Sequence, residues 1–173
     1  SNAQHDIPLT LNYHALTETI EFEMPVTGGD NARLKFIVGL ADSDAGLQIL
    51  GTSVAMSVLQ PWLKLGVDAL QDFSVEQGHA DFSVAFIENK ALNIAIQLHQ
   101  LGASNQRGTL ASEGLMANLN LDASFAAHSA LWTGTISLDL TAGGVYAEPV
   151  YLDLEKFPLK STATLSFAPE TLA

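Results

Sequence analysis

The chain has 173 residues, the length of about one domain. Only 15% of its residues are charged, against about 25% in an average soluble domain, and the 19 acidic and 7 basic residues leave a net charge of −12. Because the few cations are scattered, the sequence argues against binding to nucleic acid or to an anionic membrane surface. The absence of cysteine excludes disulfides, thiolate metal sites and a cysteine nucleophile.

The sequence is expected to form a single β domain. Ser1-Asn2-Ala3 resembles the scar left when a protease removes an expression tag, so residues 4–173 are taken as the domain. No low-complexity linker or block of charge divides this stretch. No apolar run approaches the ~20 residues that a membrane-spanning helix needs, so no transmembrane segment is expected.

Alternation of apolar and polar residues predicts strands along most of the chain. The clearest case runs from Leu115 to Phe125, where every odd position is apolar and the positions between them include Asn118, Asn120 and Asp122. A helix would turn those polar residues toward the buried side, whereas a strand keeps them on one face. In chain order, the predicted strands cover residues 7–13, 20–24, 34–40, 80–86, 92–98, 115–125, 132–140 and 157–167.

Turn-forming residues separate these strands. They are found at residues 27–31, 42–46, 88–90 and 141–144. Within them, Gly28-Gly29 and Gly143-Gly144 are interpreted as hairpin turns. Connections this short join antiparallel neighbours, because a parallel crossover needs a dozen or more residues.

One segment has a helical period instead. Its apolar residues recur at i, i+4, i+8 and i+11 and are Leu59, Leu63, Val67 and Leu70. This stripe predicts one short helix over residues 58–70. Pro61 suits the first turn of such a helix, and Ser57 is a candidate N-cap.

The strand pattern predicts the fold class. An antiparallel sheet with one apolar face must bury that face, either against a second sheet, by closing on itself, or beneath the helix together with a bound apolar ligand. A helix of about 13 residues is ~20 Å long and cannot cover eight or more strands. We therefore expect a mostly β fold, a strongly curved antiparallel sheet in the form of a β-groove or half-open barrel. A membrane-spanning barrel is the competing arrangement, but the scattered Phe residues do not form its two aromatic girdles.

Candidate metal ligands are few. Asp42-Ser43-Asp44-Ala45-Gly46 begins like a calcium loop, but Ser53 stands where the closing Glu is required, which favours a solvated turn. The histidines lack the helical spacing of a zinc motif and are interpreted as exposed residues, although strands could still gather them in space. They are His5, His14, His79, His99 and His128. No metal and no cofactor is predicted.

The one carboxylate pair of interest is Glu21 and Glu23. The two residues share a strand face, as the carboxylates of a glycoside hydrolase must. That face is the polar one, where the burial that tunes a catalytic carboxylate is not expected. The sequence also lacks a G-x-S-x-G elbow, a phosphate-binding glycine loop and a dinucleotide fingerprint. The chain is therefore predicted not to be an enzyme, with a hydrolase of envelope carbohydrate as an alternative.

The last third of the chain carries a family resemblance. The relevant stretches are Leu131-Trp132-Thr133-Gly134-Thr135-Ile136-Ser137-Leu138, Gly143-Gly144-Val145-Tyr146-Ala147-Glu148-Pro149-Val150-Tyr151-Leu152-Asp153 and Phe157-Pro158-Leu159, together with the alternation of Leu115 to Asp122. Over about residues 108–167 this pattern resembles AsmA-like and YdbH-like bacterial envelope proteins. The resemblance implies a curved β-groove that carries lipid between membranes, with no catalytic residues to transfer. At 173 residues the chain would be a fragment or a single-module relative.

The pattern and the resemblance together predict a periplasmic domain that shields acyl chains of a phospholipid or fatty acid, in envelope lipid transport or maintenance. The apolar residues expected to line the groove are Phe82, Phe86, Ile94, Leu119, Leu121, Trp132, Ile136, Leu138 and Leu165. These residues could equally form an ordinary core. The alternative is a β-sandwich that acts as a structural or protein-interaction module and recruits an envelope protein through an edge strand. A segment upstream of Gln4 is expected to direct the protein to the periplasm or tether it to a membrane.

Overall fold

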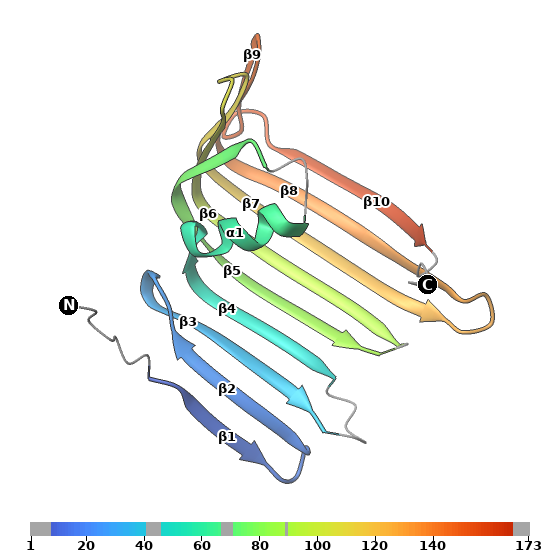
Figure 1. The fold of residues 1–173 in the computed structure, drawn as a ribbon. Coiled ribbons are helices and arrows are strands. Elements are labelled where there is room, and N and C mark those ends of the chain that lie inside the picture. Colours follow the sequence, from blue (N-terminus) through green and yellow to red (C-terminus); the bar gives the residue numbers. More distant parts are fainter. Residues whose placement is uncertain (1–7, 41–45, 67–70, 89, 168–173) are drawn as a thin grey trace.

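The computed structural model describes residues 8–40, 46–66, 71–88 and 90–167, which form one antiparallel sheet and one helix (Figure 1). The strands are β1 (Thr10–His14), β2 (Thr19–Pro25), β3 (Gly28–Gly39), β4 (Leu47–Ala55), β5 (Phe73–Ile87), β6 (Ala91–Asn105), β7 (Leu110–Ala126), β8 (Leu131–Ala147), β9 (Val150–Asp153) and β10 (Leu159–Phe167), and the helix is α1 (Met56–Gly66).

The sheet is a meander in which each strand pairs with the next one along the chain. Its order is β1-β2-β3-β4-β5-β6-β7-β8-β10, and the short β9 pairs with β8 beside this path. The sheet is not closed, so β1 and β10 are its two edges. The predicted fold class, an open and curved antiparallel sheet with one short helix, is confirmed.

The strand register gives the sheet one apolar face and one polar face. Residues paired directly across two strands point to the same side. One row of the apolar face consists of Leu11, Phe22, Phe36, Ile49, Val84, Ile94, Leu121, Ile136 and Ala163. The row beside it points the other way, to the polar face, and consists of Thr10, Glu23, Lys35, Leu50, Ser83, Ala95, Asn120, Ser137 and Thr162.

The long strands bend along a single line of bulges. Six consecutive strands each have a residue of positive φ beside a break in register, and these residues are Asn31, Ser53, Gly78, Gln100, Gly114 and Gly143. A bulge inserts an unpaired residue and bends its strand. Because the bulges lie in neighbouring strands, the ends of β5 to β8 turn away from the main sheet together, as Figure 1 shows.

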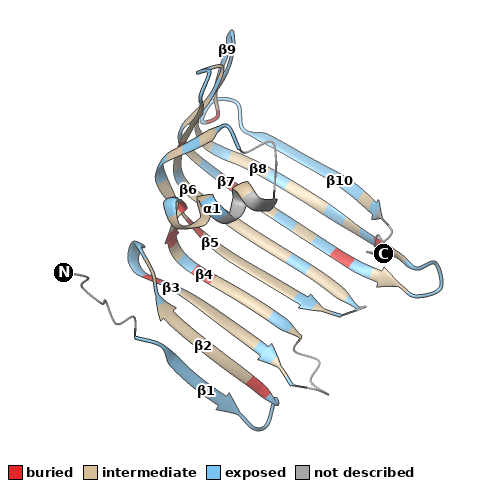
Figure 2. Ribbon diagram, viewed as in Figure 1, coloured by how far each residue is buried: buried red, intermediate tan, exposed pale blue. Residues whose placement is uncertain are grey.

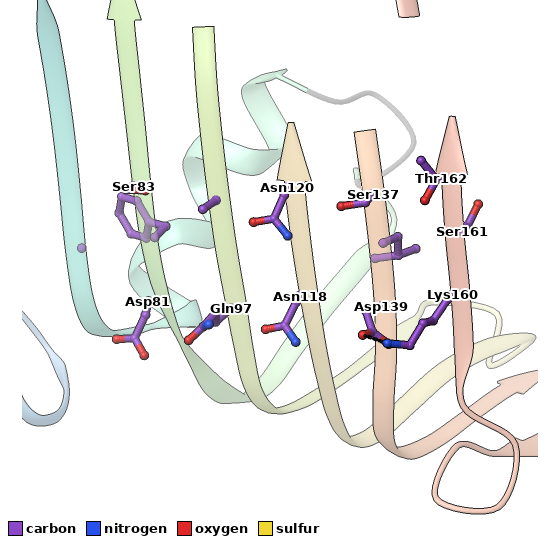
Figure 3. Close-up of a pocket in the computed structure, with 14 residues that line it drawn as sticks. Asp81, Ser83, Gln97, Asn118, Asn120, Ser137, Asp139, Lys160, Ser161 and Thr162 are labelled. Carbon is purple, nitrogen blue, oxygen red and sulfur yellow. Dashed lines mark ion pairs between the residues drawn. The ribbon is translucent and has the colours of Figure 1, made fainter. Parts of the chain in front are cut away.

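α1 lies on the apolar side of the sheet at this bend. Gln60 Nε2 donates a hydrogen bond to the carbonyl of Phe73 at the start of β5, at 3.1 Å. Val54 and Ala80, which are paired on the apolar face next to the helix, are 0% and 1% exposed. α1 stands in front of the sheet in Figure 1, and behind it in Figure 3, where the polar face is toward the viewer. The helix therefore covers only one end of β4 and β5.

The interior of the protein is small. The buried apolar side chains among the described residues are Ala32, Val54, Met56, Ala80, Ala117, Ala123, Trp132 and Leu154. Most strand positions are only partly covered (Figure 2). The whole chain, terminal segments included, exposes 11587 Å², whereas a compact monomer of this mass exposes about 8,200 Å². A single layer with little cover accounts for the difference.

Several local predictions were wrong. β4 and β9 were not predicted at all. Gly28-Gly29 and Gly143-Gly144 lie inside β3 and β8 rather than in hairpin turns. The helix begins at Met56, so Ser57 is a helical residue rather than its cap and Pro61 lies in the helix interior instead of the first turn.

Some predictions concern positions outside the described residues. These positions are His5, Ile7, the loop residues 42–45 of the calcium-like motif and the last part of the predicted helix, residues 67–70.

Candidate functional site

The nine residues predicted to line a groove all lie on the apolar face. Phe82, Leu119 and Leu138 belong to one row, which the pairs Phe82–Ile96, Ile96–Leu119 and Leu119–Leu138 define. The next row holds Ile94, Leu121 and Ile136, and Phe86, Trp132 and Leu165 lie beyond it toward the hairpin ends. The strand register therefore places all nine predicted residues on one face of the sheet.

This apolar face is exposed over much of its area. Its larger side chains include Leu11, Tyr13, Val38, Leu47, Phe86, Leu138 and Leu159, each between 37% and 59% exposed. No second sheet covers it in the described parts of the chain, which form one sheet only. The sandwich architecture of the alternative hypothesis is therefore absent from the described residues.

An aromatic cluster lies at the end of the apolar face opposite α1. The rings of Phe86 and Trp132 stack with centroids 6.3 Å apart, and those of Phe125 and Trp132 are tilted at 5.6 Å. Phe86 and Trp132 come from β5 and β8, which are not neighbours, so the rings span the strands between them. Trp132 is only 7% exposed and forms a rigid end to the apolar surface.

The polar face carries a groove that the sequence did not reveal. It has a volume of about 560 Å³ and runs across β5, β6, β7, β8 and β10. Its polar lining consists of Asp81, Ser83, Gln97, Asn118, Asn120, Ser137, Asp139, Lys160, Ser161 and Thr162. Phe82 and Leu138 also line it, and these two residues and Ser161 belong by register to the apolar face. Figure 3 shows these side chains gathered along neighbouring strands. The polar positions of the alternating strands could have indicated this groove, but the alternation was used only to predict strands and an apolar face.

The charges of this polar groove are largely paired. Lys160 Nζ lies 2.8 Å from Asp139 Oδ2 across the β8–β10 pair. Asp139 Oδ1 is buried and has no hydrogen-bond partner within the part of the chain that the structure describes. This oxygen is covered by protein atoms, so it is not open to the polar groove.

At the bend, Asp81 joins three strands. Its Oδ1 accepts a hydrogen bond from the Ser53 amide of β4 at 2.7 Å, and its Oδ2 lies 2.9 Å from His99 Nε2 of β6. The amide of Ser53 and then His99 hold the pKa of the Asp81 carboxyl below its ordinary value. The His99 ring stacks on His79 with centroids 4.9 Å apart. Strands thus gather two of the histidines, which stack on each other beside the Asp81 carboxylate.

Glu21 and Glu23 are committed to ion pairs on the polar face. Glu21 Oε2 lies 2.9 Å from Lys35 Nζ and 3.6 Å from His14 Nε2, and Glu23 Oε1 lies 3.5 Å from Arg33 Nη1. The hydrogen bond from Lys35 lowers the pKa of the Glu21 carboxyl. A general acid needs the opposite shift, so the arrangement does not favour glycoside hydrolysis.

Two further observations concern metals and membranes. Across residues 8–40, 46–66, 71–88 and 90–167, no group of three or more acidic or histidine side chains is placed to hold a metal ion. Among those same residues, no helix is long and apolar enough to cross a bilayer.

Comparison of the chain with protein-family models, with curated proteins and with solved structures found no match.

Proposed function

We propose that this protein shields acyl chains of phospholipid or fatty acid on its apolar face, as a periplasmic β-groove domain in envelope lipid transport or maintenance. One observation carries the proposal: a broad apolar sheet face that α1 covers only at one end. Exposed apolar patches of this extent mark binding surfaces in soluble proteins. An acyl chain removes such a surface from water without requiring a specific polar contact.

The dimensions of the face suit one layer of lipid tails. From Ala80 beside the helix to Phe86 in the aromatic cluster, six residues of strand span about 20 Å. Each leaflet of a bilayer has a hydrocarbon depth of about 15 Å, half of the ~30 Å core. A tail lying along the strands therefore fits between α1 and the Phe86–Trp132 stack.

The energetics favour binding of a chain of ordinary length. Each CH₂ removed from water contributes about 0.8 kcal/mol. A dodecyl chain with one side against the sheet gains several kcal/mol in this way, from which the cost of ordering the chain and losing its free motion is subtracted. The expected affinity is micromolar rather than nanomolar, because the opposite side of the tail stays in water.

A matched pair of variants on β8 tests the proposal. Leu138→Asp places a charge on the apolar face, where Leu138 is 37% exposed, and Thr133→Asp places the same charge on the polar face of the same strand. Dodecanoylglycerol is the probe, and calorimetric titration is the measurement. We expect at least a tenfold loss of affinity for Leu138→Asp and less than twofold for Thr133→Asp. Equal affinities in both variants, or no binding to the unmodified protein, would contradict the proposal.

An observation also favours the second candidate function, a protein-interaction module. β10 is an edge strand of nine residues, and Leu159 to Thr164 are exposed along it. Its outer edge presents unpaired backbone groups to which an extended peptide can add. Co-purification distinguishes the two functions: native mass spectrometry of protein from a bacterial host shows bound lipid under the first and an intact envelope-protein complex under the second.

A further inference from the structure

The polar groove has the size of a ligand site, and most of its lining residues point to the opposite side of the sheet from the acyl-chain surface. Its volume of about 560 Å³ falls within the roughly 300–1,000 Å³ of small-molecule sites. Its lining includes Ala95 on the polar face, whose short side chain leaves a depression between longer side chains. The groove therefore needs an explanation separate from the proposed lipid function.

The side chains of this polar groove are free to bind. Within the described part of the chain, the amides of Gln97, Asn118 and Asn120 make no hydrogen bond to protein, and neither do the hydroxyls of Ser137 and Thr162. Elsewhere on the same face, Asn93 Nδ2 donates a hydrogen bond to Asp122 Oδ1 at 2.9 Å. Each free amide offers both donors and an acceptor, and each hydroxyl offers one donor and two lone pairs.

The charge of the groove decides between classes of polar ligand. Asp81 and Asp139 against Lys160 leave it with one net negative charge, and the chain as a whole carries −12. Phosphates, uronates and nucleic acids are therefore disfavoured. A neutral ligand whose groups both donate and accept hydrogen bonds is favoured, because the lining offers both.

We propose that the polar groove across β5–β8 and β10 binds a neutral oligosaccharide through the side chains of Gln97, Asn118, Asn120, Ser137 and Thr162. The hydroxyls of a sugar supply donors and acceptors at close intervals, which match the free amides and hydroxyls of the groove. Among the residues that the structure describes, no Trp or Tyr lines the groove to stack on a sugar ring, and the aromatic residue in its lining is Phe82, which belongs to the apolar face by register. The expected affinity is consequently millimolar.

The test is an amide-resolved NMR titration of the protein with cellotetraose, with a hexuronate oligomer as the anionic comparison. We expect chemical shift changes confined to amides of β6, β7 and β8 around the groove, and at least fivefold weaker binding of Asn120→Ala. The matched control is Asn93→Ala, which has the same chemistry on the same face outside the groove and is expected to bind as the unmodified protein does. If Asn120→Ala does not fold, Gln97→Ala serves in its place.

Three results would overturn the proposal. They are no shift change at tens of millimolar cellotetraose, equal weakening in the Asn120 and Asn93 variants, and equally strong binding of the anionic oligomer. The acyl-chain proposal concerns the other face, so it is unaffected by any of them.

Discussion

Asp81 shows how a single side chain can hold a bend in a sheet. The register break of β4 exposes the amide of Ser53, a residue with φ of 48°, and the Asp81 carboxylate accepts that hydrogen bond while pairing with His99. An amide freed by a bulge needs a partner of this kind. One carboxylate therefore links β4, β5 and β6 where regular pairing is interrupted.

We expect Asp81→Asn to lower the free energy of unfolding by about 1 kcal/mol at pH 7, a value reduced for the partial exposure of the pair. Because the folded-state pKa of Asp81 lies below its ordinary 3.8, the carboxylate stabilises the fold fully above that pH. This contribution is lost as the pH falls through the lowered pKa. Urea unfolding at pH 7 and pH 3 measures the difference, which should shrink at pH 3.

The control for this prediction is Asp122→Asn. Asp122 is exposed on the polar face and accepts a hydrogen bond from Asn93, so a change within about 0.5 kcal/mol is expected, as for other surface substitutions. A difference between the unmodified protein and Asp81→Asn that stays the same at pH 3 would show that the charge of Asp81 is not what stabilises the bend.

The contacts of Asp81 with Ser53 and His99 also show which features of single residues can be predicted from the sequence. The face on which Asp81 and His99 lie follows from alternation, and so does the opposite face, on which the register places the nine apolar residues. The contacts of Asp81 could not be predicted from the alternation. Asp81, His99 and Ser53 are far apart in the chain, and they meet only because bulges shift the strand register. Uncommitted amides such as Asn118 look the same in sequence as solvated ones.

At the scale of elements, the bend depends on residues that adopt positive φ. Gly143 has a φ of 91°, and a Cβ added there would lie 2.5 Å from the carbonyl oxygen of Gly114 in the neighbouring strand. Gly114 itself has a φ of 59°, with open space where its Cβ would be. A substitution at Gly114 therefore has only the conformational cost of a side chain, whereas one at Gly143 has a steric cost as well.

We expect Gly114→Ala to destabilise the protein by about 1 kcal/mol, the cost of a left-handed conformation for an L-residue. Gly143→Ala has a similar conformational cost, and its Cβ would also force the backbones of β7 and β8 apart. We therefore expect its loss in free energy of unfolding to be at least twice that of Gly114→Ala. Thermal unfolding of both variants provides the comparison. Equal losses would mean that β7 and β8 can separate freely at the bend.

The same bulges explain which elements the sequence predicted poorly. A bulge adds one residue, which moves the following residues to the opposite face and interrupts the period of two. The predicted strands of residues 80–86 and 92–98 therefore stop where β5 and β6 bend, although both continue beyond. β4 was missed because Leu50 is apolar on the polar face and the bulge at Ser53 follows directly.

At the scale of the whole molecule, charge opposes the association that an uncovered apolar face favours. The polar face contributes amides and hydroxyls, and the acidic surface adds repulsion between molecules at neutral pH. This repulsion weakens toward the isoelectric point of about 4.5. The protein is then left with a broad apolar face and two open sheet edges, both of which promote association.

We therefore expect the lipid-free protein to self-associate near pH 4.5 and to remain monomeric at pH 7. Dodecanoylglycerol carries no charge at either pH, so it should suppress association only by covering the apolar face. Sedimentation velocity at both pH values, with and without the probe, measures this effect. Leu138→Asp provides the control, since the acyl-chain proposal expects it to weaken probe binding. Its charge also weakens association through the apolar face, so the control compares the variant with and without the probe, and the probe should leave its association at pH 4.5 unchanged. Association that the probe leaves unchanged would show that the open edges, rather than the apolar face, join the molecules.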